Sequence, residues 1–126
     1  LVWGLLDHTG QPRPLHRAYT LMATLLPEGA ERIALPDAPR GHLSPNAAAP
    51  ADLNAALLTR DPSGTLRLLV INQEDEERTV RLRREGVPLL PRSGLTLFDP
   101  PTEFRGLLVA NEAVPVPPRS VSLITY

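Results

Sequence analysis

The acidic residues are the groups in this chain that could perform acid/base chemistry. A pair of carboxylates can share that work only if the two side chains face each other across a pocket. Asp61 and Asp99 lie in turn sequences, residues 74–77 form an acidic run in a predicted loop, and Glu103 and Glu112 flank short predicted strands. Nothing in this spacing brings two of them face to face. The sequence therefore predicts no catalytic carboxylate pair within this chain.

Other reactive and metal-binding patterns are also missing from the sequence. His8, His16 and His42 fall in a predicted turn, helix and linker, without the i, i+4 spacing of a helical metal site. The acidic run lacks the alternating ligands and the glycine of a calcium loop, and we interpret it as a solvated hairpin loop. The chain has no cysteine, no Gly-x-Ser-x-Gly elbow and no glycine-rich loop that opens a helix. We expect no catalytic residue, no metal and no cofactor.

Composition narrows the range of partners. The formal net charge is −1, so the large positive field that attracts nucleic acid or an anionic membrane is absent. All 13 basic residues are arginine, which we interpret as a compositional bias of the source rather than a functional cluster. No apolar run approaches the roughly 20 residues that span a bilayer. We therefore expect neither a nucleic-acid nor a membrane partner.

The candidate groups must be positioned by strands, and residues 52–84 read as a three-strand antiparallel meander. Leu53–Arg60 and Thr65–Asn72 are joined by Asp61–Gly64, whose Asp-Pro-Ser-Gly sequence is typical of a type I turn. Arg78–Arg83 supplies the third strand, which alternates between apolar and charged residues. In that strand we expect two side chains to face a core and two to face water: Val80 and Leu82, and Arg81 and Arg83, respectively.

A helix is predicted before the meander. Leu1–Leu6 reads as the end of a buried strand, Asp7–Gly10 as a turn, and Pro14–Leu26 as the helix, with proline at the first helical position. Pro27 and Gly29 end it. Apolar residues recur at the spacing of one buried helix face: Leu15, Ala18, Tyr19, Met22, Leu25 and Leu26.

The remaining segments favour a β-sandwich. Asp37–Pro50 is rich in proline and alanine and reads as a loop or linker, preceded by a short strand candidate at Arg32–Leu35. Further strand candidates are Leu95–Phe98, Gly106–Ala110 and Ser120–Tyr126, and prolines 115, 117 and 118 oppose pairing between the last two. Six or so short strands separated by turn signals are typical of an antiparallel sandwich.

Aromatic residues decide whether a sandwich can bind sugars by stacking. After the linker only Phe98, Phe104 and Tyr126 are present, and a stacking platform would use all of them. Core positions suit these rings better, because aromatic side chains are usually buried. A carbohydrate-binding module therefore stays as the alternative hypothesis.

Three stretches carry a family resemblance: Trp3–Pro14, Asp61–Asn72 and Pro117–Ile124. They are similar to stretches of retaining glycoside hydrolases. The first is similar to the "W-G-L-x-D-x-x-G-x-P-(K/R)-P" pattern that follows the eighth strand of the (β/α)8 barrel in family 39 β-xylosidases and α-L-iduronidases, with family 51 α-L-arabinofuranosidases next. The second and third are similar to stretches of the C-terminal sandwiches of these enzymes.

The resemblance implies an organisation in three parts. Residues 1–36 would be the last strand and helix of a barrel and the lead into a sandwich, 37–50 a linker, and 51–126 an antiparallel β-sandwich accessory domain. Because active sites of such barrels lie at the C-terminal ends of the strands, Trp3 would be the one residue here able to floor a sugar subsite. Its alternative role is to seal the barrel core.

The resemblance also implies a function. The acid/base and nucleophile glutamates of the family lie upstream of Leu1, and the chain starts without Met inside an apolar segment, so we interpret it as a fragment. We expect the chain alone to be inactive. It would be the non-catalytic C-terminal portion of a hydrolase of xylosidic or arabinosidic linkages, with the catalytic barrel as its partner. The alternative is a sandwich module that binds carbohydrate or protein.

Overall fold

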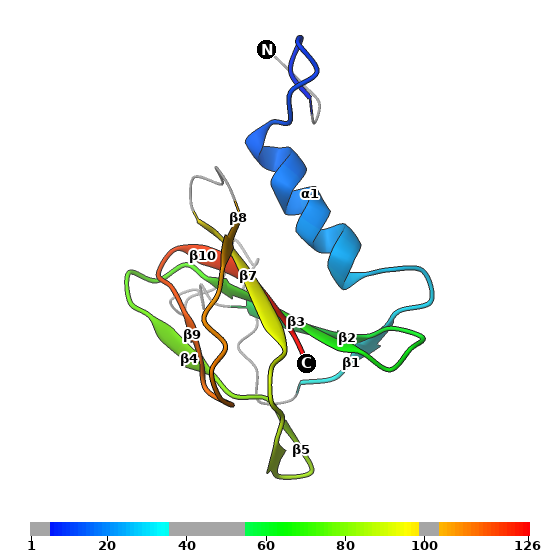
Figure 1. Cartoon of the computed structure of the whole chain (residues 1–126), viewed down its shortest axis with the longest axis vertical. Coiled ribbons are helices and arrows are strands. Elements are labelled where there is room, and N and C mark those ends of the chain that lie inside the picture. The colour runs from blue at the N-terminus through cyan, green and yellow to red at the C-terminus, as the bar shows by residue number, and fades with distance from the viewer. Residues whose placement is uncertain (1–5, 36–54, 99–103) are drawn as a thin grey trace, which may run out of the picture.

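The computed structural model describes residues 6–35, 55–98 and 104–126, and this part of the chain is mainly β (Figure 1). It contains one helix and ten strands. In chain order they are α1 (Pro14–Leu25), β1 (Glu31–Ile33), β2 (Ala55–Arg60), β3 (Leu66–Asn72), β4 (Arg78–Val80), β5 (Arg83–Arg84), β6 (Val87–Pro88), β7 (Ser93–Phe98), β8 (Phe104–Gly106), β9 (Val114–Val116) and β10 (Ser120–Thr125). The predicted linker at 37–50 lies outside the described residues.

The β2–β3 hairpin forms at the predicted turn. Asp61 Oδ1 accepts hydrogen bonds from the backbone N–H groups of Ser63 and Thr65, at 2.9 and 3.0 Å. Gly64 adopts φ 89°, a left-handed conformation that favours glycine, and its N–H donates to the Asp61 carbonyl. The strands then pair antiparallel from Arg60↔Leu66 onward. The Asp-Pro-Ser-Gly signal therefore predicted this hairpin correctly.

The six-stranded sheet has the order β1-β2-β3-β10-β7-β8 and is antiparallel throughout. The last strand of the chain, β10, lies in the middle, between β3 and β7. The predicted meander is therefore wrong in its third strand, because β4 leaves this sheet and pairs with β9 instead. β3 is apolar on both faces, and β10 matches it over six paired residues, whereas β4 is exposed at Arg78 and Thr79.

Asn72 turns the chain out of the large sheet at the end of β3. Its side chain is buried, and Nδ2 donates to the carbonyls of Glu76 and Pro117, at 2.9 and 3.0 Å. Oδ1 accepts from the Glu74 N–H at 3.1 Å. One side chain thus shapes the loop after β3 and ties it to the turn before β10. The loop at 73–77 is a crossover between sheets, so the expectation of a hairpin was wrong.

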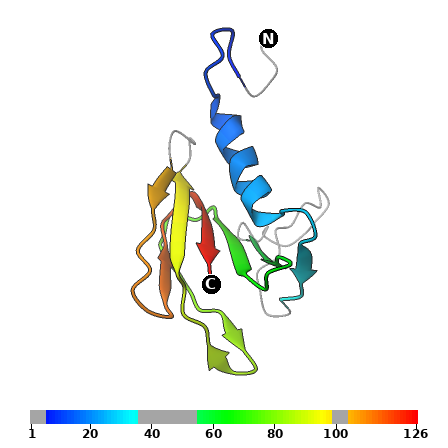
Figure 2. The same cartoon turned by 45° about the vertical axis from the view of Figure 1, so that its right-hand side comes forward.

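The large sheet is covered on both faces. On one face, β4 and β9 enclose an aliphatic cluster, and on the other the helix α1 covers a second one (Figure 2). The first cluster contains Leu58, Leu66, Leu68, Val70, Leu82, Val114, Val116, Ile124 and Tyr126. The second contains Leu21, Leu25, Leu69, Leu97 and Leu123. Because side chains alternate along a strand, β3 and β10 feed both clusters. The fold class is therefore a β-sandwich-like domain with a helix on its outer face.

Helix α1 begins at Pro14 as predicted and ends at Leu25, and its end is bound to the sheet. The buried Thr59 hydroxyl on β2 donates to the Leu25 carbonyl at 2.7 Å. The predicted buried face is correct for Leu25 but wrong for three of its members. Leu21 takes their place beside the sheet. The three exposed side chains are Tyr19, Met22 and Leu26, at 57%, 39% and 47% exposed.

The structure also tests the predictions made for residues 80–83, for residues 106–110 and for the prolines that follow them. Val80 is half-buried and Leu82 is buried, while Arg81 and Arg83 are exposed, as predicted. The strand expected at Gly106–Ala110 is wrong beyond Gly106, because β8 (Phe104–Gly106) ends there after pairing with β7, and residues 107–110 form no strand. The segment Gly106–Ala110 does not pair with the final strand, as expected, and Pro115 lies inside β9, which pairs with β4.

We predict that Tyr126→Phe stabilises the fold. The Tyr126 ring lies in the first cluster, and its hydroxyl is buried with no hydrogen-bond partner among the described residues. Burial raises the pKa of Tyr126 to about 12. Removing the unsatisfied group should raise the free energy of unfolding by about 1 kcal/mol in urea titrations. It should also reduce the loss of stability above about pH 10, where the phenol ionises more readily in the unfolded chain.

The matched control is Tyr19→Phe, whose exposed hydroxyl should leave stability unchanged. A lower free energy of unfolding for Tyr126→Phe would show that the hydroxyl has a partner that stabilises the fold.

Candidate functional site

Several carboxylates of the described residues hold turns or form ion pairs. Glu31 pairs with Arg60 and Asp75 with Arg119, each at 2.7 Å, and Glu74 pairs with Arg78. Asp99 and Glu103 lie outside the part of the chain that the structure describes. Within that part, no group of three His, Cys, Asp or Glu residues could hold a metal ion.

Asp61 is a carboxylate with a strongly lowered pKa, and its role is to hold a turn. The Ser63 hydroxyl donates to Oδ1 at 2.6 Å, and the Arg67 guanidinium donates to Oδ2 at 2.8 Å. These bonds lower the pKa of Asp61 to about 2, with the Ser63 hydroxyl as the largest cause. An acid this strong stays ionised, so Asp61 is a structural anion and not a proton donor.

Asp7 organises the segment before α1. Its Oδ1 accepts hydrogen bonds from the Thr9 N–H, the Thr9 hydroxyl and the Gln11 N–H, at 2.8, 2.7 and 2.9 Å. The Thr9 hydroxyl and the Gln11 N–H are the main causes that lower the pKa of Asp7. Leu6 and Pro12 form an isolated bridge across this turn. The predicted turn at 7–10 is therefore present, and it aligns the chain for the helix that follows.

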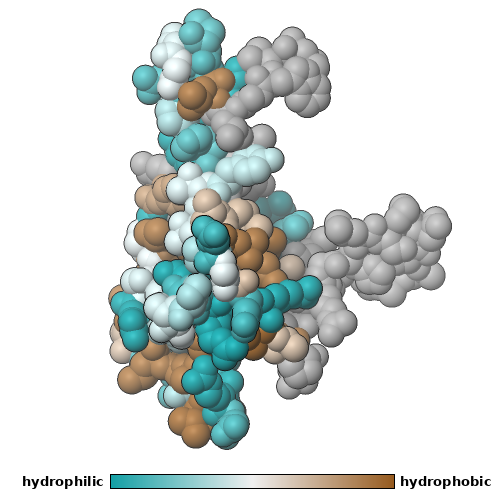
Figure 3. All heavy atoms as spheres, turned by 90° about the vertical axis from the view of Figure 1, so that its right-hand side faces the viewer, coloured by the Kyte–Doolittle hydropathy of each residue, from teal (hydrophilic) through white to brown (hydrophobic). Residues whose placement is uncertain are grey.

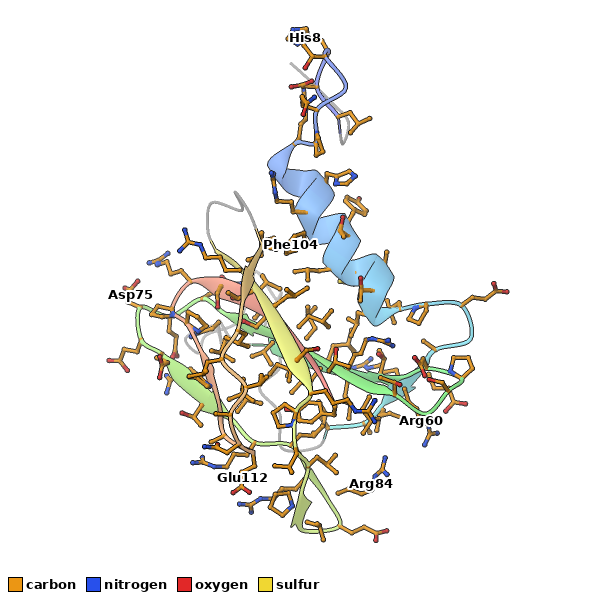
Figure 4. All side chains as sticks on the ribbon, viewed as in Figure 1. His8, Arg60, Asp75, Arg84, Phe104 and Glu112 are labelled. Carbon is orange, nitrogen blue, oxygen red and sulfur yellow. The ribbon has the colours of Figure 1, made fainter. Side chains whose placement is uncertain are left out.

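The two histidines of the described residues lie on different elements. His8 is exposed at the far end of the N-terminal turn, whereas His16 is half-buried on α1 (Figure 4). His42 lies outside the described segments. Trp3, the proposed sugar-stacking residue, is also outside them, so its role stays a prediction.

The aromatic side chains do not form an exposed sugar platform among the described residues. Tyr126 is 7% exposed inside the first cluster. Phe104 is half-buried and packs against the cluster beneath α1, close to the helix in Figure 4. Tyr19 is the exposed ring, but it lies on the helix and not on the sandwich. The core position expected for Tyr126 is confirmed, Phe104 lies at the edge of the core, and the Phe98 side chain lies outside the described part.

The candidate functional surface is the outer helix face, which we define as Tyr19, Met22 and Leu26. These three apolar side chains lie at i, i+3 and i+7 and are 39–57% exposed. At 100° per residue, Tyr19 and Met22 are centred roughly 110° around the axis from Leu21 and Leu25, which face the sheet, and Leu26 is the residue that caps the end of the helix. The N-terminal part of α1 also extends beyond the sheet (Figures 1 and 2). The helix thus has two apolar faces, and only one of them is covered.

The sequence pattern predicted that these residues belong to one buried helix face, and it did not place Leu21 on that face. The signal that could have separated the two faces was the width of the apolar arc, which is too wide for contact with a single layer. No helix among the described residues has the length and apolar character needed to cross a membrane.

Comparison with known proteins gives a likeness of fold. No family model matches the chain, and no curated protein sequence matches it. Among solved structures it is similar to the catalytic domain of GH30 xylanase C from Talaromyces cellulolyticus, with a TM-score of 0.59 and 13% sequence identity. The match covers 86% of this chain and 23% of the xylanase chain. The described fold is therefore like part of a glycoside hydrolase structure, and this neighbour gives no support to family 39 or 51 in particular.

We predict that Asp61→Asn weakens the dependence of stability on pH. The folded state lowers the pKa of Asp61 from 3.8 to about 2, so its stabilising effect is complete above about pH 4 and is lost as pH falls toward 2. Asparagine keeps an acceptor for the turn but does not titrate. Urea titrations between about pH 5 and pH 2 should show a smaller decline for this variant than for the original chain.

Asp75→Asn is the matched control, because its ion pair with Arg119 has an exposed carboxylate. It should keep the original pH dependence. An unchanged decline for Asp61→Asn would contradict the structural role of this carboxylate.

Proposed function

We propose that this chain is the non-catalytic C-terminal portion of a glycoside hydrolase and that it braces the catalytic barrel of its parent protein. The observation that carries this proposal is the outer helix face. Tyr19, Met22 and Leu26 remain exposed although α1 already packs on the sheet through Leu21 and Leu25. A helix that is apolar on two sides is suited to lie between two layers.

The barrel is the partner that best suits this face. The match covers 23% of the GH30 xylanase chain, so most of that catalytic domain lies outside the matched part. The resemblance of residues 3–14 to the end of a barrel agrees with a helix that joins the two bodies. Apolar surface removed from water at such an interface contributes about 25 cal/mol per Å².

The chemistry of the described residues favours a supporting role. Asp61 holds a turn and pairs with Arg67, and Glu31 and Asp75 pair with arginine. The reacting groups would come from the barrel. Substrates with xylosidic or arabinosidic linkages are proposed from the sequence resemblance, and a xylanase among the structural neighbours is consistent with the first of them.

The alternative, a sandwich that binds carbohydrate, has less support. Its natural platform would be Phe98, Phe104 and Tyr126, yet Tyr126 is buried and Phe104 packs toward the helix. Stacking on a sugar needs an open ring face. A protein-interaction role for the sandwich remains compatible with bracing.

We predict that the chain alone does not hydrolyse aryl xylosides or aryl arabinofuranosides, because the described carboxylates provide no acid/base pair.

The bracing surface is tested by Met22→Gln with Leu26→Gln, placed both in the isolated chain and in the parent enzyme. Exposed residues contribute little in isolation, so the melting temperature of the isolated chain should change by less than about 2 °C. In the parent enzyme the same pair should lower the melting temperature by several degrees.

The matched control is Leu21→Gln with Leu25→Gln, which places polar groups against the sheet and should destabilise the chain in both contexts. Measurable turnover by the isolated chain, or an unchanged parent melting temperature for the outer-face pair, would overturn the proposal.

We also predict that the chain migrates without retardation in native gels that contain xylan, arabinan or cellulose. Stacking on these polymers would need rings that the core uses. Retardation that Phe104→Ala abolishes, with the fold intact by circular dichroism, would favour the carbohydrate-binding alternative.

A further inference from the structure

The β5–β6 hairpin is a projecting arm at the opposite end of the molecule from the N-terminal turn (Figures 1 and 2). We define the arm as residues 81–92. Glu85 and Gly86 have φ of 50° and 80°, so the arm closes in a two-residue turn with both central residues left-handed. Its second leg is anchored where the Arg92 N–H donates to the Thr125 carbonyl at 2.7 Å. The arm is therefore preformed and tied to the central strand β10.

One edge of the arm offers free backbone groups. Arg84 pairs with Val87 beside the turn, and the Leu89 N–H donates to the Leu82 carbonyl at 2.9 Å. In an antiparallel ladder the residues between such bonded pairs point their N–H and C=O groups outward. On β5 that residue is Arg83, with a full donor and acceptor. On β6 it is Pro88, which has no N–H to donate. Strand addition is thus possible along β5, whose only pairing partner among the described strands is β6.

The arm also concentrates unpaired positive charge. It carries four arginines and one glutamate, a net charge of +3, in a chain whose net charge is −1. Arg60, Arg67, Arg78 and Arg119 all pair with carboxylates elsewhere. In contrast, Arg81, Arg83 and Arg84 form no ion pair with any described residue and are exposed. Figure 4 shows Arg84 directed away from the body beside the hairpin.

The outer surface of the arm combines this charge with aliphatic side chains. Alternation and the Arg83↔Pro88 pairing place Arg81, Arg83, Pro88 and Leu90 on one face, while Leu82 and Leu89 turn toward the core. On this face Leu90 is 70% exposed, and Val87, which pairs with Arg84 on the other face, is 62% exposed. In Figure 3 apolar and hydrophilic surface lie beside each other at the end of the molecule that holds the arm. Arginine beside exposed aliphatic groups is a surface suited to protein association.

We propose that the arm binds an extended acidic segment of another polypeptide, which adds as a strand to the free edge of β5. Its alternate carboxylates would accept hydrogen bonds from the guanidinium groups of Arg81 and Arg83, and the residues between them would be aliphatic. A polysaccharide fits less well, because the arm has no aromatic ring for stacking and its free edge presents backbone donors and acceptors. The proposal is independent of the barrel-bracing role.

The test is a calorimetric and NMR titration of the intact chain with a probe peptide of alternating glutamate and valine. We expect saturable binding with chemical shift changes confined to residues 81–92. Arg81→Gln with Arg83→Gln should weaken the Kd by about tenfold or more, which corresponds to about 1.4 kcal/mol. The matched control is Arg17→Gln with Arg32→Gln, which removes the same charge from α1 and β1 and should leave the Kd unchanged.

Two further probes separate strand addition from simple charge attraction. The same peptide with methyl groups on alternate backbone nitrogens should bind at least about tenfold more weakly, since it cannot complete the ladder. Polygalacturonate, a carboxylated polysaccharide, should bind more weakly than the peptide. The proposal is overturned by an absence of peptide binding, by equal binding of the methylated peptide or of polygalacturonate, or by equal effects of the two arginine pairs.

Discussion

Burial of the central strands on both faces is the constraint on which the rest of this structure depends. Leu68 and Ile124 face the small β4–β9 sheet, whereas Leu69 and Leu123, their neighbours on β3 and β10, face the helix. A strand that is apolar on both sides is stable only when a layer covers each side. The helix is therefore part of the domain core, although it precedes the sandwich in the chain. Its outer face follows from the same arrangement, because only one side of a helix can rest on a sheet.

Local signals in the sequence predicted local structure well. The Asp61 turn, the start of α1 at Pro14, the exposed side chains of Arg81 and Arg83, and the turn held by Asp7 all depend on side chains that act within a few residues. Strand pairing across long separations was not predictable in this way. β4 had β3 as its nearest neighbour in sequence, yet β10 took that position because its apolar pattern matches β3 across two faces. Asn72 completes that choice through contacts with residues 76 and 117, which no local pattern reveals.

The candidate surfaces were harder to find than the fold. The helix residues Tyr19, Met22 and Leu26 were recognised as apolar, but only the position of the sheet shows that they stay uncovered. The arginine arm was expected to contribute one ordinary strand, and its free edge becomes visible once β6 folds back on β5. The roles of the carboxylates were easier to predict from the sequence, because their turn and loop positions already indicated structural roles. These positions are the basis of the roles in support and association that we propose for this chain.

We propose that the outer helix face is covered in the parent enzyme and exposed in this chain. Met22 is the single methionine of the sequence and is 39% exposed, so its oxidation by hydrogen peroxide reports directly on that face. The rate of sulfoxide formation at Met22, measured by mass spectrometry in the isolated chain and in the intact parent enzyme, is the most direct test. Strong protection of Met22 in the parent is the result that bracing predicts. Equal rates of oxidation in the two proteins would contradict it.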